Sequence, residues 1–239
     1  MAPGQYDETL EKLKGLANPA NLAGMAGFGI NTGRSLGVSV SKLREVAKEI
    51  GVDRGLALQL WEAGIRETRL LATMIDDPKE ITEEQAESWV NDLDSWDVCD
   101  GCCMLLQRTG FAAQKCVEWS SREGEFVKRA GFALMARLAV TDKSAGDERF
   151  HGFLSIIQRE STDGRNYVKK GVSWALRQIG KRSQALNRRA IETAREIQRM
   201  DSRSARWIAS DALRELTSQS VQERLLAKKS GGKSSRASG

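Results

Sequence analysis

A short aromatic and basic pattern occurs twice in this chain of 239 residues. Phe126-Val127-Lys128-Arg129 returns 41 residues later as Tyr167-Val168-Lys169-Lys170. A fainter repeat relates Trp174-Ala175-Leu176-Arg177 to Asp211-Ala212-Leu213-Arg214, 37 residues further along. A period near 40 residues is typical of proteins built from stacked supersecondary units, each of which buries one face against its neighbours. The repeat therefore restricts the fold to an assembly of similar successive units.

These units are predicted to be helical. Apolar residues recur at helical spacing in nearly every segment, and no segment alternates as a half-buried strand does. Ser39 or Ser41 caps one helix that Gly51 ends, and Thr82 to Gln85 is a capping box. Two helices per unit predict an all-α, HEAT-like solenoid whose inner helices line a concave face. We expect helices over residues 5–17, 21–28, 39–50, 54–62, 65–76, 82–93, 96–108, 111–120, 124–140, 147–160, 164–181, 184–200 and 203–216.

The domain organisation follows from where this pattern ends. Residues 1–216 are expected to form one solenoid domain, and residues 217–239 a C-terminal extension. The extension loses its large apolar residues after Leu226 and ends in a basic Gly/Ser-rich tail, for which we expect disorder. No run approaches the roughly 18 apolar residues that span a bilayer, and the N-terminus lacks a signal-peptide pattern. We therefore expect a cytoplasmic monomer.

Charge is divided unevenly along the chain. Residues 1–120 contain 12 Lys and Arg against 19 Asp and Glu, whereas residues 121–239 contain 25 against 13. A basic half is typical of proteins that bind polyanions, of which nucleic acid is the most common. The repeated Lys/Arg pairs would recur on successive inner helices and form a positive stripe suited to a phosphate backbone. The alternative is that these cations lie along apolar surface at helix ends, with only their charged groups in water.

The segment Asp94–Asp100 places a tryptophan and a carboxylate on one helical face. Ser95 is a candidate N-cap, Asp97 falls in the first turn, and Trp96 and Asp100 are four residues apart. The ring can pack on a sugar or a base while the carboxylate faces developing positive charge. The alternative is a core tryptophan beside a surface acid.

Four cysteines lie within 18 residues: Cys99, Cys102, Cys103 and Cys116. The Cys99-x-x-Cys102 spacing resembles half of a zinc or redox site. However, the chain has one histidine, His151, and no second cysteine pair of matching spacing. We therefore expect free, mostly buried thiols in a reducing compartment, and no metal site.

Three stretches together resemble the AlkD-type DNA alkylation repair glycosylases. They are Ser95–Asp100, Phe126–Ala130 and Tyr167–Arg177. They contain the family's Trp-Asp-x-x-Asp motif and its aromatic-x-x-Lys-x-x-x-Trp-x-Leu-Arg helix, in the same order and at similar separation. Gly37-Val38 before a capped helix, and Leu60-Trp61-Glu62 before Arg66-Glu67, also look similar. The resemblance covers about residues 20–215.

The resemblance implies a HEAT-like superhelix whose concave face holds duplex DNA. It also implies excision of purines alkylated at N3 or N7, without a metal or organic cofactor. On matching positions Asp100 would be the catalytic carboxylate, and Trp96 and Trp174 would pack against the DNA backbone around the lesion. The expected DNA-contacting residues are Arg129, Arg137, Lys128, Lys169, Lys170, Arg177 and Phe28, the last at a position where relatives often have tyrosine.

Besides Phe28, the chain departs from the family pattern in two places. Ser95 replaces an aromatic residue common before the motif tryptophan, and the glycine-rich segment from Gly27 to Gly37 is atypical.

On the predicted helix 164–181, the aliphatic residues Val168, Val172, Ala175 and Ile179 form the expected core face. Trp174 lies to one side of that face, near Lys170 and Arg177, as an aromatic on a DNA-contacting side would.

The expected chemistry needs one carboxylate. A purine alkylated at N3 or N7 already carries positive charge, so it leaves without a proton donor, and a fixed carboxylate can stabilise the oxocarbenium-like sugar. No lysine in the motif takes the place of a nucleophile, which favours attack by water over a Schiff base. Two alternatives stay open: a module that binds damaged or branched DNA without chemistry, and a protein-interaction solenoid with a mixed or acidic concave face. On DNA, the protein would be associated with the nucleoid.

Overall fold

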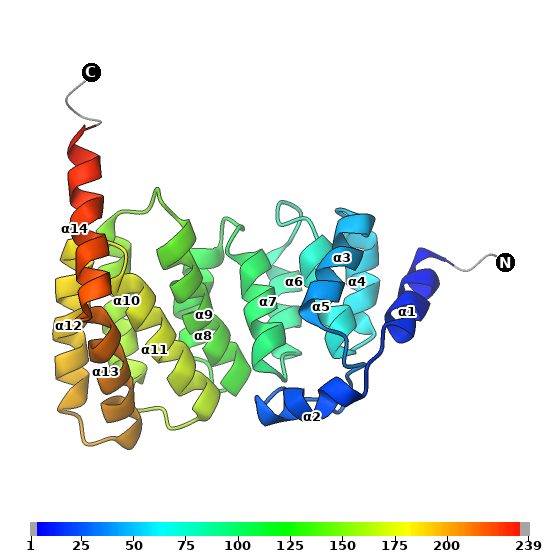
Figure 1. Ribbon diagram of the computed structural model, residues 1–239, viewed down its shortest axis with the longest axis horizontal. Coiled ribbons are helices and arrows are strands. Elements are labelled where there is room, and N and C mark those ends of the chain that lie inside the picture. The colour runs from blue at the N-terminus through cyan, green and yellow to red at the C-terminus, as the bar shows by residue number, and fades with distance from the viewer. Residues whose placement is uncertain (1–3, 235–239) are drawn as a thin grey trace. The chain divides into compact units, whose positions relative to one another are not determined.

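The computed structural model describes residues 4–234, and the side chains of residues 4–227. Within these residues the chain forms fourteen α-helices and no strand, so the all-α prediction is confirmed (Figure 1). The helices group into two compact units, unit 1 (Met1–Ala112) and unit 2 (Ala113–Gly239). The prediction that residues 1–216 form a single domain stays a prediction, and each unit is described by itself.

Unit 1 contains seven complete helices in two layers: α1 (Gln5–Gly15), α2 (Ala20–Gly27), α3 (Val40–Ile50), α4 (Arg54–Glu62), α5 (Arg66–Ile75), α6 (Glu83–Asn91) and α7 (Trp96–Leu106). In one layer α5 packs between α3 and α7, while α4 pairs with α5 and α6 with α7. The rings of Trp61 on α4 and Trp89 on α6 stack with centroids 4.1 Å apart. The Trp61 indole also donates a hydrogen bond to Asp92 Oδ2 (2.9 Å), which satisfies the polar atom of a fully buried ring.

Unit 2 follows the same plan with longer helices: α8 (Ala112–Ser120), α9 (Glu125–Thr141), α10 (Asp147–Glu160), α11 (Asn166–Gly180), α12 (Gln184–Gln198), α13 (Arg203–Leu216) and α14 (Gln219–Ser234). Helix α11 packs between α9 and α13, α10 packs on α12, and α14 lies against α13. Phe126 and Tyr167, which begin the repeated tetrapeptides, stack with ring centroids 5.2 Å apart. The 41-residue repeat therefore corresponds to neighbouring helices α9 and α11.

Close helix packing in unit 2 depends on two glycines. A Cβ at Gly131 of α9 would lie 2.6 Å from the backbone nitrogen of Ser120, at the end of α8. A Cβ at Gly180 of α11 would lie 2.7 Å from the side chain of Leu216, at the end of α13. The predicted aliphatic face of α11 is fully buried at Val168, Val172, Ala175 and Ile179, as expected.

The predicted caps are confirmed in part. Ser39, rather than Ser41, caps α3 by accepting a hydrogen bond from Lys42 N (3.4 Å). Thr82 accepts one from Gln85 N (3.2 Å), but the Gln85 amide donates to Asp76 Oδ2 (2.6 Å) and does not return to Thr82. Only half of the predicted capping box is formed, because the Gln85 side chain binds the buried carboxylate of Asp76, at the end of α5, and not the backbone of Thr82.

The C-terminal extension is helical where the sequence predicted no helix. Helix α14 continues to Ser234 and buries Val221 and Leu225, with Leu226 exposed. The predicted disorder of the basic tail stays a prediction, because the side chains of residues 228–234 and all of residues 235–239 lie outside the described part of the chain. No helix within residues 4–234 is long and apolar enough to cross a membrane.

Candidate active site and nucleic-acid interface

Helix α7 begins at Trp96, directly after the predicted N-cap Ser95. Ser95 has the extended backbone of a cap (φ −146°, ψ 144°), but its hydroxyl accepts no hydrogen bond from the helix. Instead it donates to Asp97 Oδ1 (2.6 Å) and accepts from Asn31 N (3.4 Å). Ser95 thus occupies the predicted N-cap position, but without the side-chain hydrogen bond of a cap. Its side chain is buried and joins the first turn of α7 to the segment after α2.

A buried ion-pair network continues from Asp97 into α5. Asp97 Oδ2 accepts from Arg66 Nε (2.6 Å), and Arg66 Nη1 donates to Glu67 Oε1 (3.0 Å). Glu67 is fully buried and also accepts from the backbone nitrogens of Leu36 (2.8 Å) and Gly37 (3.1 Å). The network thus holds the glycine-rich segment and α7 to α5. In the sequence, Arg66 and Glu67 stood out only as part of the family resemblance, and this role was not predicted.

Gly37 explains part of the atypical glycine-rich segment. Its φ is +74°, which L side chains rarely adopt, and a Cβ there would lie 2.2 Å from the carbonyl oxygen of Asn18. The backbone nitrogen of Asn18 in turn donates to the carbonyl of Leu36 (2.9 Å). Only glycine allows the chain to return this closely to the start of α2.

Trp96 and Asp100 share the half-buried face of α7, whereas Val98, Cys99 and Cys102 are buried on its other side. The Trp96 indole donates a hydrogen bond to the carbonyl oxygen of Phe28 (3.1 Å), at the end of α2. The structure therefore brings Trp96, Asp100 and Phe28 into the same part of unit 1. A half-buried carboxylate keeps access to a ligand, while its low-dielectric surroundings strengthen its field.

Phe28 and Gly101 complete the surroundings of this face. The Phe28 side chain is 78% exposed, and α2 as a whole buries no residue. On the packed side, a Cβ at Gly101 would lie 3.1 Å from Leu70 and 3.3 Å from Thr73 Oγ1 of α5. Gly101 therefore lets α7 approach α5 closely, which fixes the helix that carries Asp100.

All four cysteines are free and buried, as expected. Burial raises the pKa of the Cys102 thiol, and burial together with the neighbouring Cys99 raises that of Cys103. Within the described residues, no three His, Cys, Asp or Glu side chains are grouped to hold a metal ion.

In unit 2, the first repeated basic pair has internal partners. The Lys128 ammonium lies 2.8 Å from Glu160 Oε2 and 3.4 Å from Asp163 Oδ2. Burial alone would raise the pKa of Glu160, but hydrogen bonds from Lys128 and Arg159 outweigh it and the pKa lies below its ordinary value. The neighbouring Arg129 is 5% exposed and donates from Nη1 to the carbonyl of Tyr167 (3.1 Å).

The second basic pair is more accessible. Lys169 Nζ lies 4.8 Å from the centroid of the Trp207 ring, as in a cation–π contact, and Lys170 is exposed. Arg177, one turn after Trp174, is paired with Glu215 (2.6 Å) and Asp211 (3.3 Å) on α13. The structure thus gives Lys128 and Arg177 carboxylate partners that the sequence did not predict. The contact of these basic residues with DNA stays a prediction.

Trp174 and Arg137 are both half-buried. Trp174 lies beside the buried aliphatic face of α11, as expected, and its neighbour Ser173 donates to Asp211 Oδ2 (2.7 Å). The Nε of Arg137 on α9 is buried and has no hydrogen-bond partner among the described residues.

The predicted site residues are therefore divided between the units. Trp96, Asp100 and Phe28 belong to unit 1, whereas Trp174 and the predicted basic contacts belong to unit 2. The prediction that all of them serve one DNA-binding face stays a prediction.

The family of the chain is shown by one family model. The family model described as "DNA alkylation repair enzyme" matches residues 9–216. One similar solved structure, with a TM-score of 0.75 and 18% identity, covers 89% of this chain and 96% of the other. It is described as a new family of proteins related to the HEAT-like repeat DNA glycosylases with affinity for branched DNA structures.

The other comparisons add little. A designed armadillo repeat protein has a TM-score of 0.32 at 17% identity, over 74% of this chain and 92% of its own. A search of curated proteins finds no match. The first solved structure shows the fold, and the predicted HEAT-like repeat architecture is confirmed.

Proposed function

Because the chain belongs to the DNA alkylation repair enzyme family, we propose that it is a monofunctional alkylpurine DNA glycosylase. Its reaction would be hydrolysis of the N-glycosidic bond of N3- or N7-alkylated purines in duplex DNA. The observation that carries this proposal is the position of Asp100. Its carboxylate lies half-buried beside Trp96, on a helix that the Arg66–Asp97 ion pair and Gly101 hold in place.

In the proposed reaction the damaged base leaves as a neutral purine, because alkylation has already given it positive charge. The positive charge then develops on the deoxyribose. The Asp100 carboxylate would stabilise it most strongly in the transition state, where the charge is greatest. The same carboxylate would accept a proton from the water that attacks the sugar.

Trp96 and Phe28 would supply the apolar contacts in unit 1. The hydrogen bond from the Trp96 indole to the Phe28 carbonyl leaves the face of the indole ring to pack on a sugar. The exposed Phe28 ring is an unpartnered apolar surface at the end of α2. No lysine lies in the Trp96–Asp100 segment to form a Schiff base, which favours water as the nucleophile.

In unit 2, Trp174, Arg137, Lys169 and Lys170 would contact the DNA backbone. Arg129 is 5% exposed and bonded to the Tyr167 carbonyl, so it would act mainly through the fold. Lys170 is exposed and Lys169 lies over a half-exposed tryptophan, so both can approach a phosphate without breaking an ion pair with a carboxylate. Lys128 and Arg177 would act mainly through the fold, because their carboxylate partners neutralise them.

The proposal is tested by release of 7-methylguanine from a defined duplex. We expect Asp100→Asn to lower the rate of excision about 100-fold or more, the usual effect of removing transition-state charge stabilisation. The affinity for the duplex should change little, because a carboxylate does not bind the negatively charged phosphates. Asp94→Asn is the matched control, since it removes an exposed carboxylate just before α7. Excision by Asp100→Asn within a few-fold of wild type would remove Asp100 from the mechanism.

A second function is favoured by the likeness to the structure described with affinity for branched DNA. The chain would then bind a DNA junction without chemistry. A wild-type protein that releases no 7-methylguanine, yet binds a four-way junction more tightly than a linear duplex of the same length, would favour this function over the glycosylase.

A further inference from the structure

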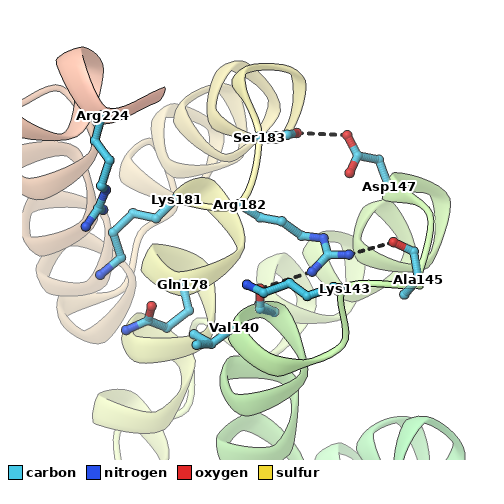
Figure 2. Close-up of a pocket in the computed structure, with 10 residues that line it drawn as sticks. Val140, Lys143, Ala145, Asp147, Gln178, Lys181, Arg182, Ser183 and Arg224 are labelled. Carbon is cyan, nitrogen blue, oxygen red and sulfur yellow. Dashed lines mark hydrogen bonds between the residues drawn. The ribbon is translucent and has the colours of Figure 1, made fainter. Parts of the chain in front are cut away.

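A basic pocket of about 690 Å³ lies within unit 2, away from the residues discussed so far. It is formed by the last turns of α9 and α11, the segment between α9 and α10, the turn that leads into α12, and α14. Figure 2 shows Lys181 and Arg224 on one side of it and Lys143 on the other. Its volume is in the range of ligand-binding sites.

The pocket is lined by four cations and one carboxylate. The cations are Lys143, Lys181, Arg182 and Arg224, and the carboxylate is Asp147. Asp147 Oδ2 accepts a hydrogen bond from Ser183 Oγ (2.8 Å). The lining therefore has a clear excess of positive charge, which favours an anion as its ligand.

Two of the cations are fixed by the fold. Arg182 donates to the carbonyl oxygen of Ala145 (2.6 Å; Figure 2) and to that of Ala139 (3.2 Å). Its guanidinium also lies 4.3 Å from the centroid of the Phe150 ring. The bond to Ala139 places a cation at the C-terminal end of α9, where it interacts favourably with the helix dipole. Lys181 pairs with Glu215. The positive charges of Arg182 and Lys181 therefore already have partners within the protein, and no ligand is needed to account for them.

Lys143 and Arg224 have no such explanation. Both are exposed at the pocket, and among the described residues neither side chain has a hydrogen bond or an ion pair. They are placed on two different elements, yet they line one hollow together with Arg182. Two unpaired cations beside a fixed guanidinium form a set of donors that a phosphate group can accept from.

We infer that this pocket binds a phosphate group of the DNA backbone. The inference rests on the proposed DNA-binding function and adds a second binding region to it. Cations that are exposed at a pocket's edge suit a phosphate carried in from outside by a continuing strand, whereas a small phosphorylated molecule is usually enclosed. The pocket lies at the C-terminal end of α11, roughly 16 Å along the helix from Lys170, at 1.5 Å per residue.

The test is the salt dependence of binding to an undamaged linear duplex. The variant is Lys143→Gln with Arg224→Gln, and the matched control is Lys48→Gln with Arg188→Gln, which removes the same two charges at exposed positions outside the pocket. We expect the slope of log K against log salt to fall by about 0.9 for each phosphate that the variant no longer neutralises, and the control to keep the wild-type slope. Because all four residues are exposed, thermal melts should show that both variants fold.

Unchanged slope in the pocket variant, or the same fall in the control, overturns the inference. A third arm measures the binding of tripolyphosphate, which also serves as a competitor of DNA. If the variant loses tripolyphosphate binding but binds DNA as wild type does, the pocket serves a free phosphorylated molecule and the inference is wrong. Wild type that binds no DNA overturns both this inference and the proposed function. Wild type that binds DNA and shows the expected fall, but releases no 7-methylguanine, supports the phosphate pocket while the proposed glycosylase fails.

Discussion

In unit 1 a buried ion-pair network fixes a loop and a helix start, whereas in unit 2 the ion pairs join neighbouring helices. Arg66, Glu67 and Asp97 of unit 1 are almost completely enclosed, and they leave the next carboxylate along α7, Asp100, on the half-buried face. In unit 2, carboxylates such as Glu160 and Glu215 pair with the cations of neighbouring helices. The network of unit 1 positions one carboxylate, that of Asp100. The ion pairs of unit 2 neutralise some of its many basic side chains.

The comparison shows that the charge counted along a sequence differs from the charge offered at a surface. Unit 1 contains an excess of acids, yet its arginine Arg66 has no freedom to meet a ligand. Unit 2 contains an excess of bases, but Lys128 and Arg177 are already paired. Of the basic residues proposed to bind DNA, Lys170, Lys143 and Arg224 are exposed.

The largest effect should come from breaking the network of unit 1. Arg66→Met leaves Glu67 and Asp97 buried without their cation, and we expect the free energy of unfolding to fall by ~3–5 kcal/mol. Urea denaturation measures this, with Lys48→Met as an exposed control. A decrease below about 1 kcal/mol would mean that the network contributes no more than a surface pair, and the contrast between the units would disappear.

Trp174→Ala tests whether an aromatic of unit 2 serves function or packing. Because Trp174 is half-buried beside the aliphatic face of α11, we expect a decrease in stability well under the ~3–5 kcal/mol of an emptied core tryptophan site. Excision per folded molecule should fall. Trp119→Ala is the control, since that tryptophan is fully buried in the same unit. A large decrease in stability with normal excision per folded molecule would show that Trp174 is a packing residue.

The paired carboxylates of unit 2 predict its response to acid. The pKa values of Glu160 and Glu215 lie below the ordinary 4.5: burial would raise them, but lysine and arginine partners outweigh it. A lowered folded-state pKa contributes stability above the unfolded value, and this stability is lost as pH falls through the folded value. We therefore expect stability to decline below about pH 4.5, less steeply in Glu160→Gln with Glu215→Gln. An unchanged pH profile in that variant would show that these pairs add nothing.

The smallest expected effect is a difference in the salt dependence of DNA binding between variants of two lysines of the repeat. Lys170→Gln should lower the log–log salt slope of DNA binding by about 0.9, since it removes one exposed cation. Lys128→Gln should leave the slope nearly unchanged and reduce stability, because its ammonium is held by Glu160 and Asp163. Equal slopes for the two variants would contradict the assignment of one lysine to the surface and the other to the fold.

Much of the fold could be predicted because it depends on local pattern. The aliphatic face of α11, the start of α7 and the shared face of Trp96 and Asp100 follow from helical spacing alone. Family resemblance then assigned a role to Asp100. The extra helix α14 was missed because the Gly/Ser-rich composition after Leu226 argued against a helix there.

The ion pairs could not be predicted in the same way. Arg66 and Asp97 are 31 residues apart, and Lys128 and Glu160 are 32 apart. Such pairs form only when tertiary packing brings two helices together, and no local pattern marks which acid will meet which base. For the same reason Lys143 and Arg224, which come from distant segments, could not be recognised as neighbours from sequence.

The four buried thiols have a consequence for the proposed function, which would place the protein where alkylating electrophiles are present. The thiolate is the most nucleophilic form of any protein side chain, and its supply depends on exposure and pKa. Burial keeps all four cysteines from solvent, and it raises the pKa of Cys102, Cys103 and Cys116, so that these stay protonated. An agent that methylates DNA therefore meets no accessible thiol on the folded chain. Under the proposed function, the thiols of the protein would be protected from the same agents that produce its substrate.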